Sequence, residues 1–273
     1  MNTASNDPWQ KPDSQSDDVL NAMMTRLEDR GDNHRFRQMI LDYLEHIPSD
    51  KPIRILDLGC GTGVVTREIR NHVHKESEVT GADVSARMLE KAAQLAPDMS
   101  IKWAQVPEDR LPFHGGCFDI IVMHTLMTHV PDPLSMLSSA RTLLKPDGTL
   151  IIFDADYAGN TFAHPDLHTM RETDFKLFRA IASNIDICRQ LPALLKQAGY
   201  ALKSHRGYVL SEAGHGDFWL SSVRGFAKMI PSLGVLTPDE GHAWVNHMLN
   251  AHENGTFFAS GNYYTFVAQA ATQ

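Results

Sequence analysis

Three glycines alternate along one short stretch of the chain, and an acidic residue comes shortly before them. Asp57 closes an apolar run that begins at Ile53, and Gly59, Gly61 and Gly63 follow it. A strand that leads into a glycine-rich turn and then a helix lets the backbone approach a nucleotide closely, because a Cβ there would hold the ligand away. The pattern therefore predicts a nucleotide site. A tight structural turn, with Asp57 capping the next helix, is the alternative.

A second acidic residue ends the next apolar run, about twenty residues along the chain. Residues 78–82 are expected to form a strand, and Asp83 follows them directly. In a doubly wound sheet, an acid at this position can accept hydrogen bonds from both hydroxyl groups of a ribose. Ser85 is a candidate N-cap for the helix that comes next. We expect Asp83 to bind a nucleoside, and an ordinary surface acid at a strand end is the alternative.

The elements that must position these residues alternate between strands and helices. This alternation predicts a mostly parallel sheet with right-handed crossovers, whose ligands bind at the carboxyl ends of the strands. Strands are expected over residues 53–57, 78–82, 100–105, 118–123 and 149–154, with a sixth near 202–210 and a last one over 262–268. Helices between the strands are expected near 62–72, 85–96, 132–144 and 188–199.

Several further segments follow the glycine turn in a recognisable order and spacing. They are residues 56–63, 81–85 with Met88 and Leu89, 111–113, 118–122, 129–133 and 144–150. Together they resemble the class I S-adenosylmethionine (SAM)-dependent methyltransferases, in the small-molecule branch of ubiquinone/menaquinone-type and natural-product methyltransferases. The resemblance covers residues 53–154. It implies an α/β, Rossmann-like fold with a seven-stranded, mostly parallel sheet, helices on both faces, N-terminal helices and a helical insertion after the fifth strand.

The resemblance also implies which residues bind the cofactor, SAM. Asp57 would hold the ammonium group of its methionine part, and Asp83 would hold the ribose hydroxyls. Val84 and Met88 would pack on the adenine or ribose, although Met88 fits a core position equally well. Backbone N–H groups of the turn would face the methionine carboxylate; the turn residues in this prediction are Gly59, Cys60, Gly61 and Gly63.

One part of the cofactor site departs from the family pattern. In many relatives a polar residue after the third strand contacts the adenine amino group, but here that position falls on Val106 or Pro107. Glu108 or Asp109 would take the role one residue along, or a backbone group would suffice. His124 ends the fourth strand and is expected to point into the cleft near the methionine part.

The catalytic residues are harder to identify, since methyl transfer depends mainly on proximity and orientation in a site without water. A general base helps where the acceptor atom is acidic. In the small-molecule branch a histidine in this stretch sometimes serves as that base, so His129 is a candidate; fixing its own loop by hydrogen bonding is the alternative. Asp156 follows the fifth strand, where it could position or deprotonate a substrate hydroxyl, or simply cap a helix or turn.

Composition narrows the class of protein. The chain has 273 residues, 42% of them hydrophobic, and a net charge of −8, which argues against a nucleic-acid partner because phosphates are bound by Lys and Arg patches. No apolar run approaches the roughly 18–20 residues of a membrane span. Three unevenly spaced cysteines suggest neither a disulfide framework nor a zinc site, and no metal is expected. We therefore expect a cytoplasmic monomer or homodimer that acts on a small molecule.

The chain divides into a tail and one domain. Residues 1–16 are polar and are predicted to be disordered, without a secretory signal. Residues 17–273 are predicted to form a single methyltransferase domain, with N-terminal helices over 17–50 and substrate-cap insertions over 155–187 and 211–255. The N-terminal helices either close over the SAM site or only cover a face of the sheet.

The predicted function is transfer of a methyl group from SAM to O, N or C of a small organic molecule, in secondary or cofactor metabolism. A SAM-binding cyclase or decarboxylase of the same fold is the main alternative, since a fold does not determine chemistry. A nicotinamide-dependent dehydrogenase is disfavoured, because the turn lacks Gly-x-Gly-x-x-Gly spacing and the chain has no Tyr-x-x-x-Lys run. The acceptor remains open, as does a non-catalytic SAM-binding role.

Overall fold

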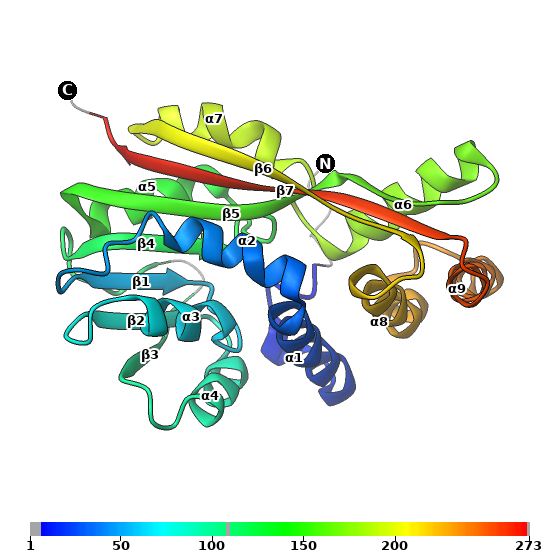
Figure 1. Ribbon diagram of the computed structural model, residues 1–273, viewed down its shortest axis with the longest axis horizontal. Helices are drawn as coiled ribbons and strands as arrows, with labels where there is room; N and C mark the ends of the chain where they lie inside the picture. The colour runs from blue at the N-terminus through cyan, green and yellow to red at the C-terminus, as the bar shows by residue number, and fades with distance from the viewer. Residues whose placement is uncertain (1–6, 108–109, 272–273) are drawn as a thin grey trace.

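The computed structural model describes residues 7–107 and 110–271. These residues form one seven-stranded sheet, in which the strands lie in the order β3-β2-β1-β4-β5-β7-β6 (Figure 1). The strands are β1 (Arg54–Leu58), β2 (Glu78–Asp83), β3 (Ile101–Gln105), β4 (Phe118–His124), β5 (Leu144–Phe162), β6 (Tyr200–Gly214) and β7 (Phe257–Ala270). Neighbouring strands are parallel except that β7 is antiparallel to both β5 and β6. The predicted α/β fold with a mostly parallel sheet is confirmed.

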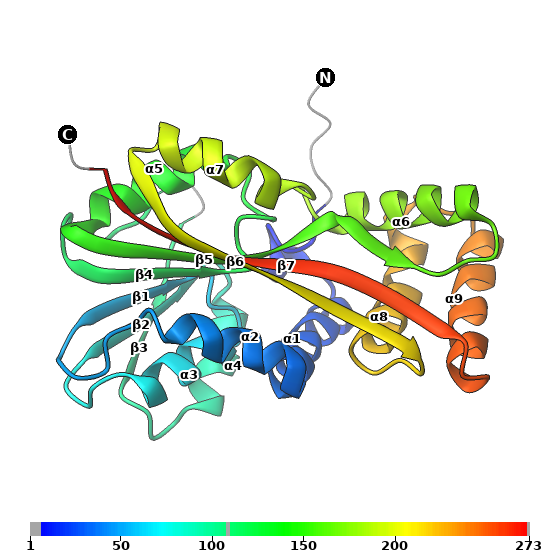
Figure 2. The same cartoon turned by 45° about the horizontal axis from the view of Figure 1, so that its top comes forward.

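Helices cover both faces of this sheet, as Figure 2 shows. Side chains alternate along each strand, so Ile55 joins the core beneath α2 and α3, while Leu56 joins the core beneath α5 and α7. The helices that flank the strands are α2 (His34–Leu44), α3 (Val64–His72), α4 (Ala86–Leu95), α5 (Pro133–Leu143) and α7 (Ile187–Gln197). The carboxyl ends of β1, β2 and β4 remain free to meet a ligand.

The last three strands in the order of the sheet are much longer than the others. They extend past the remaining strands and carry α6 (Leu167–Ile181), α8 (Phe218–Leu233) and α9 (Pro238–Glu253), which share one core (Figure 2). Aromatic rings fill the space between, with the ring of Phe162 lying 5.3 Å from Trp244 and 5.8 Å from Trp219. We call this extension the cap.

The fifth strand is longer than expected. Residues 149–154 were expected to form it, with an insertion from residue 155, but β5 runs to Phe162 and pairs with β7 as far as Ala259. The register shifts between Asp156 and Thr161, where Gly159 lies. The continuation of the strand was not predicted, because the polar residues around this bulge interrupt the alternation of apolar and polar residues by which a strand is recognised.

Two N-terminal helices complete the fold. Helix α1 (Asp17–Asp32) lies beside α8, and Asn33 separates it from α2, whose first turn it caps by accepting a hydrogen bond from the Phe36 N–H at 3.1 Å. The prediction of a disordered tail over residues 1–16 is corrected for residues 7–16, which we call the N-terminal segment. Asp7 and Pro12 are buried there, and Asp7 contacts His129 and Ser183 far along the chain; residues 1–6 lie outside the described residues.

Within residues 7–107 and 110–271, no helix has the length and apolar character needed to cross a membrane.

Candidate active site

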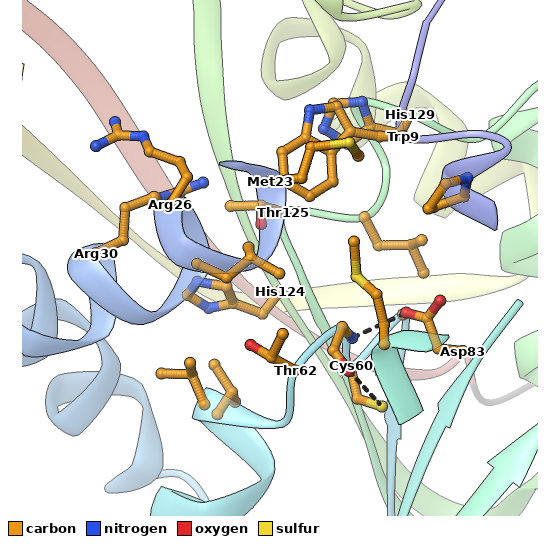
Figure 3. A pocket seen from close by; sticks show the side chains of 18 of the residues that line it. Trp9, Met23, Arg26, Arg30, Cys60, Thr62, Asp83, His124, Thr125 and His129 are labelled. Carbon is orange, nitrogen blue, oxygen red and sulfur yellow. Dashed lines mark hydrogen bonds between the residues drawn. The ribbon is translucent and has the colours of Figure 1, made fainter. Parts of the chain in front are cut away.

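A single cavity joins the tips of β1, β2 and β4 to the interior of the cap. Its first part, the turn end, is formed by Asp57, residues 59–62 and Asp83. Its second part, the cap end, is formed by Arg26, Arg30, Tyr157, Phe178, Trp219 and Tyr263. Figure 3 shows side chains from both parts, with Arg26 and Arg30 at one side of the view and Asp83 at the other.

The glycine turn brings bare backbone to the wall of the cavity. Gly59 and Gly61 both line it and have positive φ, and a Cβ on Gly61 would lie 2.8 Å from a methyl group of Leu27. Gly63 also has positive φ but does not line the cavity; a Cβ there would meet the Trp103 ring at 2.6 Å. Gly63 was predicted to contact the cofactor, but its α-carbon does not lie on the cavity wall. Glycine is required at this position because the backbone packs closely against the Trp103 ring.

Four N–H groups of the turn donate hydrogen bonds within the protein itself. Those of Gly59 and Cys60 donate to the Ala82 carbonyl at 2.8 and 3.0 Å, and that of Gly61 donates to Asp83 at 2.8 Å. The Gly63 N–H donates to the Cys60 carbonyl at 2.9 Å. The expectation that these four N–H groups face a ligand carboxylate is thus corrected. The hydroxyl of Thr62 lines the cavity instead, buried and without a partner among the described residues.

Asp57 has one satisfied and one unsatisfied carboxylate oxygen. Its Oδ2 accepts a hydrogen bond from the Thr66 hydroxyl at 2.5 Å, whereas no described residue donates to its buried Oδ1. Burial raises the pKa of Asp57 to about 7; the Thr66 hydrogen bond opposes this, and the Asp83 charge adds to it. A buried acceptor on a cavity wall calls for a donor from a ligand. An ammonium group suits this position, so Asp57 fits the predicted cofactor.

Asp83 is held by two backbone donors at the tip of β2. Its Oδ2 accepts from the Gly61 N–H at 2.8 Å and its Oδ1 from the Ser85 N–H at 2.9 Å. Each carboxylate oxygen can accept more than one hydrogen bond, so both retain capacity for ribose hydroxyls. Burial raises the pKa of Asp83. Ser85 caps α4 as predicted, accepting from the Met88 N–H at 3.0 Å.

Apolar residues form the wall beside Asp83. Val84, Met88, Val106 and Pro107 all line the cavity, and Met88 also packs on Leu20 and Met23 of α1. Met88 thus belongs to the core and also lines the cavity, and its contact with the adenine or ribose stays a prediction. The predictions for Glu108 and Asp109 fall outside the described residues.

His124 lines the cavity at the tip of β4, as expected. Its Nδ1 lies 2.9 Å from the hydroxyl of Tyr43, and its ring stacks on Phe153 with 4.6 Å between centroids. Burial, with a smaller effect of the Arg30 charge, lowers the pKa of His124 well below its usual value. The imidazole is therefore neutral at physiological pH.

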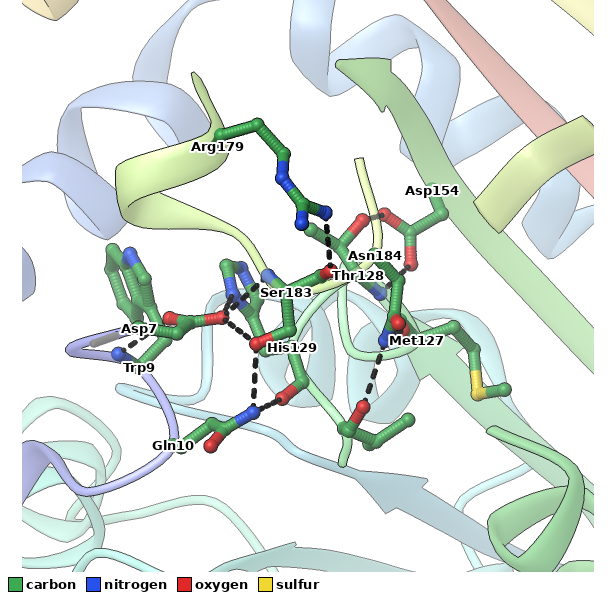
Figure 4. A network of polar contacts seen from close by, with 11 residues as sticks. Asp7, Trp9, Gln10, Met127, Thr128, His129, Asp154, Arg179, Ser183 and Asn184 are labelled. Carbon is green, nitrogen blue, oxygen red and sulfur yellow. Dashed lines mark hydrogen bonds and ion pairs between the residues drawn. The ribbon is translucent and has the colours of Figure 1, made fainter. Parts of the chain in front are cut away.

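His129 connects the cavity to the N-terminal segment (Figure 4). Its Nδ1 lies 2.9 Å from Asp7 Oδ2, and its ring centroid lies 5.7 Å from that of Trp9. The same Asp7 oxygen accepts from the N–H and the hydroxyl of Ser183, both at 3.0 Å. Gln10 donates to the His129 carbonyl at 2.8 Å. No sequence signal identified Asp7, because a polar residue in a polar stretch gives no sign of a partner 122 residues away.

The N-terminal segment is held at its other end by Asp13. This carboxylate accepts from the Ala86 N–H at 2.9 Å and from the Ser85 hydroxyl, at the start of α4. Between the two attachments, Trp9 and Pro12 line the cavity. The segment therefore crosses the mouth of the turn end, from the His129 loop to the tip of β2.

Asp156 lies away from the cavity. Arg189 of α7 holds it, with Nη2 at 2.8 Å and Nε at 3.1 Å from its carboxylate oxygens. Along β5, Phe153 and Ala155 face the α2 side of the sheet, so Asp154 and Asp156 face the α7 side. Asp154 accepts a hydrogen bond from the Thr128 hydroxyl there. The structure contradicts the prediction of a catalytic role for Asp156, which stabilises the packing of α7 on the sheet.

No cluster of three or more His, Cys, Asp or Glu side chains that could bind a metal occurs in the described part of the chain.

Comparison with known proteins gives matches of three kinds. Residues 55–148 match a protein family described as "Methyltransferase domain". An uncharacterized 37.1 kDa protein in a transposon of Streptomyces fradiae is 29% identical over 238 residues, covering 86% of this chain and 67% of that protein. A ubiquinone biosynthesis O-methyltransferase of Actinobacillus pleuropneumoniae is 32% identical over 125 residues, covering 43% of this chain. The match spans about half of that enzyme, 52% of its length.

A solved structure shows the same fold. The YcgJ protein of Bacillus subtilis is similar with a TM-score of 0.62 and 17% sequence identity, and the match covers 86% of this chain and all of that one. At this identity the likeness concerns the fold alone.

Proposed function

We propose that the chain transfers the methyl group of SAM to an O, N or C atom of a small organic molecule, since residues 55–148 match a family described as "Methyltransferase domain". The observation that carries this proposal is the buried Asp57 Oδ1, which has no donor among the described residues, at the turn end of a cavity that continues into an aromatic cap. One end of the cavity offers what a cofactor ammonium needs, and the other offers an enclosed apolar space for an acceptor.

The proposed cofactor site follows from the contacts at the turn end. Asp57 Oδ1 binds the ammonium group, the Thr62 hydroxyl meets the neighbouring carboxylate, and Asp83 accepts from the ribose hydroxyls. Gly59 and Gly61 allow the close approach. Around the adenine we propose Val84, Met88, Val106 and Pro107, with His124 near the methionine part. When bound, SAM supplies a methyl group on a positively charged sulfur, already activated for transfer.

We propose that His129 is the general base for an acidic acceptor atom. Asp7 holds its Nδ1, which leaves the other ring nitrogen to accept a proton, the arrangement in which a carboxylate orients a catalytic histidine. The remaining catalysis comes from orienting the acceptor and excluding water, since the N-terminal segment covers the mouth of the site. The contacts of His129 with Gln10 and Trp9 also hold the His129 loop in place.

The wider setting of the protein is proposed from the same features. Residues 17–273 act as one domain, in which the insertions over residues 155–187 and 211–255 enclose the acceptor. The net charge of −8 supports a small molecule rather than a nucleic acid as partner. Free cysteines at positions 60, 117 and 188 suit a reducing, cytoplasmic setting, and we propose a monomer or homodimer there.

Mass spectrometry with methyl-labelled SAM tests this proposal directly. Incubation with a library of small organic molecules should give a product heavier by one labelled methyl group, with one S-adenosylhomocysteine formed per product. Turnover of an acceptor without S-adenosylhomocysteine would refute methyl transfer in favour of cyclase or decarboxylase chemistry. Failure of S-adenosylhomocysteine to bind at all would remove the proposed cofactor site.

A further inference from the structure

Helix α8 forms one wall of the cap end and has a glycine in its middle. The helix lies between α1 and α9 (Figure 2), and Gly225, halfway along its 16 residues, lines the cavity. Glycine in the interior of a helix lowers the ratio of folded to unfolded protein about two- to fivefold relative to alanine, because it loses more backbone freedom on folding. A glycine there calls for a reason, either close packing or a function.

The other glycines within the described helices are explained by close packing. A Cβ on Gly31 of α1 would lie 2.4 Å from a methyl group of Val64, and a Cβ on Gly241 of α9 would lie 2.6 Å from a methyl group of Ile230. Cβ atoms do not approach other atoms this closely, so neither position has room for a side chain. These two glycines allow α1 to approach α3 and α9 to approach α8.

Neither close packing nor backbone conformation requires glycine at position 225. Apart from its chain neighbours and the backbone of its own helical turn, no heavy atom of the described residues lies within 4 Å of the place where a Cβ on Gly225 would be. The φ angle of Gly225 is not positive, so its backbone is open to other residues. Alanine would fit there without strain and would favour the helix. The fold therefore does not explain the open space at Gly225.

This open space is part of the cavity, and the wall around it is mostly apolar. Gly225 lies on the face of α8 that lines the cavity, at three- and four-residue spacing along a face that also includes Trp219, Ser222, Phe226 and Met229. None of these side chains is charged. Helix α1 covers α8 at Ser222, whose hydroxyl accepts from Arg26 at 2.6 Å, and Gly225 lies one turn beyond this contact. Phe178 of α6 packs edge to face on Phe226, with 5.6 Å between centroids. The space therefore suits an uncharged, apolar group.

We propose that Gly225 is a specificity-determining residue: a bulky apolar group of the methyl acceptor lies against the bare backbone of α8 at this position. The inference rests on the proposed function and adds to it the residue that limits the size of the acceptor. The missing side chain leaves a recess in the cavity wall, bordered along the helix by Ser222, Phe226 and Met229. Each methylene group that the acceptor buries there raises its affinity about fourfold. The helix gives up stability at Gly225, and the acceptor gains the space.

Titration calorimetry on the full chain, saturated with S-adenosylhomocysteine, tests the recess. The probes are phenol and its para-alkyl derivatives from methyl to hexyl, in which the hydroxyl represents the acceptor atom and the alkyl chain the apolar group. Wild-type affinity should rise about fourfold with each methylene until the recess is filled. Gly225→Ala should end this rise about one methylene earlier. Gly225→Leu should weaken the tightest wild-type probe at least about tenfold and change phenol binding by no more than about twofold.

Urea titrations of the same variants separate a ligand site from a packing requirement. Gly225→Ala should raise the ratio of folded to unfolded protein about two- to fivefold, whereas Gly241→Ala should lower it because of Ile230. The matched control for binding is Ala227→Leu, which places leucine on an exposed position of α8 outside the cavity and should leave the probe series unchanged.

Three results would overturn the proposal. They are no gain of wild-type affinity with chain length, a gain that Gly225→Leu leaves intact, and a loss of stability in Gly225→Ala, which would show that packing requires the glycine. Absence of S-adenosylhomocysteine binding to the wild type would instead refute the proposed function.

Discussion

The pKa of Asp57 makes cofactor binding depend on pH. Burial holds this pKa at about 7 in the ligand-free protein, but an ammonium partner requires the ionised carboxylate. The ionised fraction is about 3% at pH 5.5 and about one half at pH 7, so apparent affinity should rise about fifteenfold over this interval. The cofactor amine stays charged throughout, since α-amino groups titrate at about pH 7.7–8.0. Calorimetric titration with S-adenosylhomocysteine measures the slope.

Asp57→Asn removes the titrating group while keeping its shape. We expect binding at pH 7 to weaken by about 10- to 100-fold, since a hydrogen bond to a charged group contributes about 1.5–3 kcal/mol, and the remaining affinity should not change with pH. The matched control is Asp174→Asn, because burial also raises the pKa of Asp174 to about 7, but this residue lies outside the cavity. A flat profile in the wild type, or a slope that persists in Asp57→Asn, would refute the reasoning.

The same shift has a consequence for folding. The pKa of Asp57 rises from 3.8 in the unfolded chain to about 7 in the native protein. Its contribution to stability is therefore fully present below pH 3.8 and is lost as pH rises through 7. Asp57→Asn should raise the free energy of unfolding of the ligand-free protein at pH 8 by up to about 4 kcal/mol. A variant that gains stability while losing ligand affinity separates a binding residue from a structural one.

Three further changes test other parts of the site. Asp83→Ala should weaken S-adenosylhomocysteine about 100-fold or more in calorimetry, because two ribose hydrogen bonds to a carboxylate are lost; an unchanged dissociation constant would contradict the assignment of the ribose. His129→Gln should lower kcat for an acidic acceptor about 100-fold or more with little change in KM; unchanged kcat with weaker cofactor binding would leave His129 only the task of holding the N-terminal segment. Gly61→Ala should lower the free energy of unfolding by about 1–3 kcal/mol in urea titrations, because φ is +53° and the new Cβ would lie 2.8 Å from Leu27; a gain in stability would contradict the described turn.

The sequence was most informative where local pattern determines structure. Apolar runs, the glycine turn and the two acids at strand ends identified β1 and β2 and placed Asp57 and Asp83 on one cavity. These features follow from neighbours in the chain and from the rule that parallel strands end at a common edge. The assignment of Ser85 as a helix cap succeeded for the same reason.

The sequence did not identify contacts between residues that lie far apart in the chain. Asp7 binds His129 and Ser183, and Arg30 lies over Phe36 in a cavity wall, yet both look in the sequence like solvated polar residues. The error at Asp156 has a different cause. The strand continues past its expected end, and the alternation of side chains then turns this residue toward Arg189 and away from the cavity.

The long strands of the cap limit how the cavity can open. Strand β5 has 19 residues and extends for roughly 60 Å, and it serves both the sheet beneath the turn end and the wall of the cap end. The cap therefore has no hinge: swinging it outward would shear the ladder hydrogen bonds among three strands at once. The N-terminal segment, tied down by the side chains of Asp7 and Asp13, breaks far fewer bonds when it lifts. The ten residues of the N-terminal segment, rather than the cap, are thus placed to open and close this site.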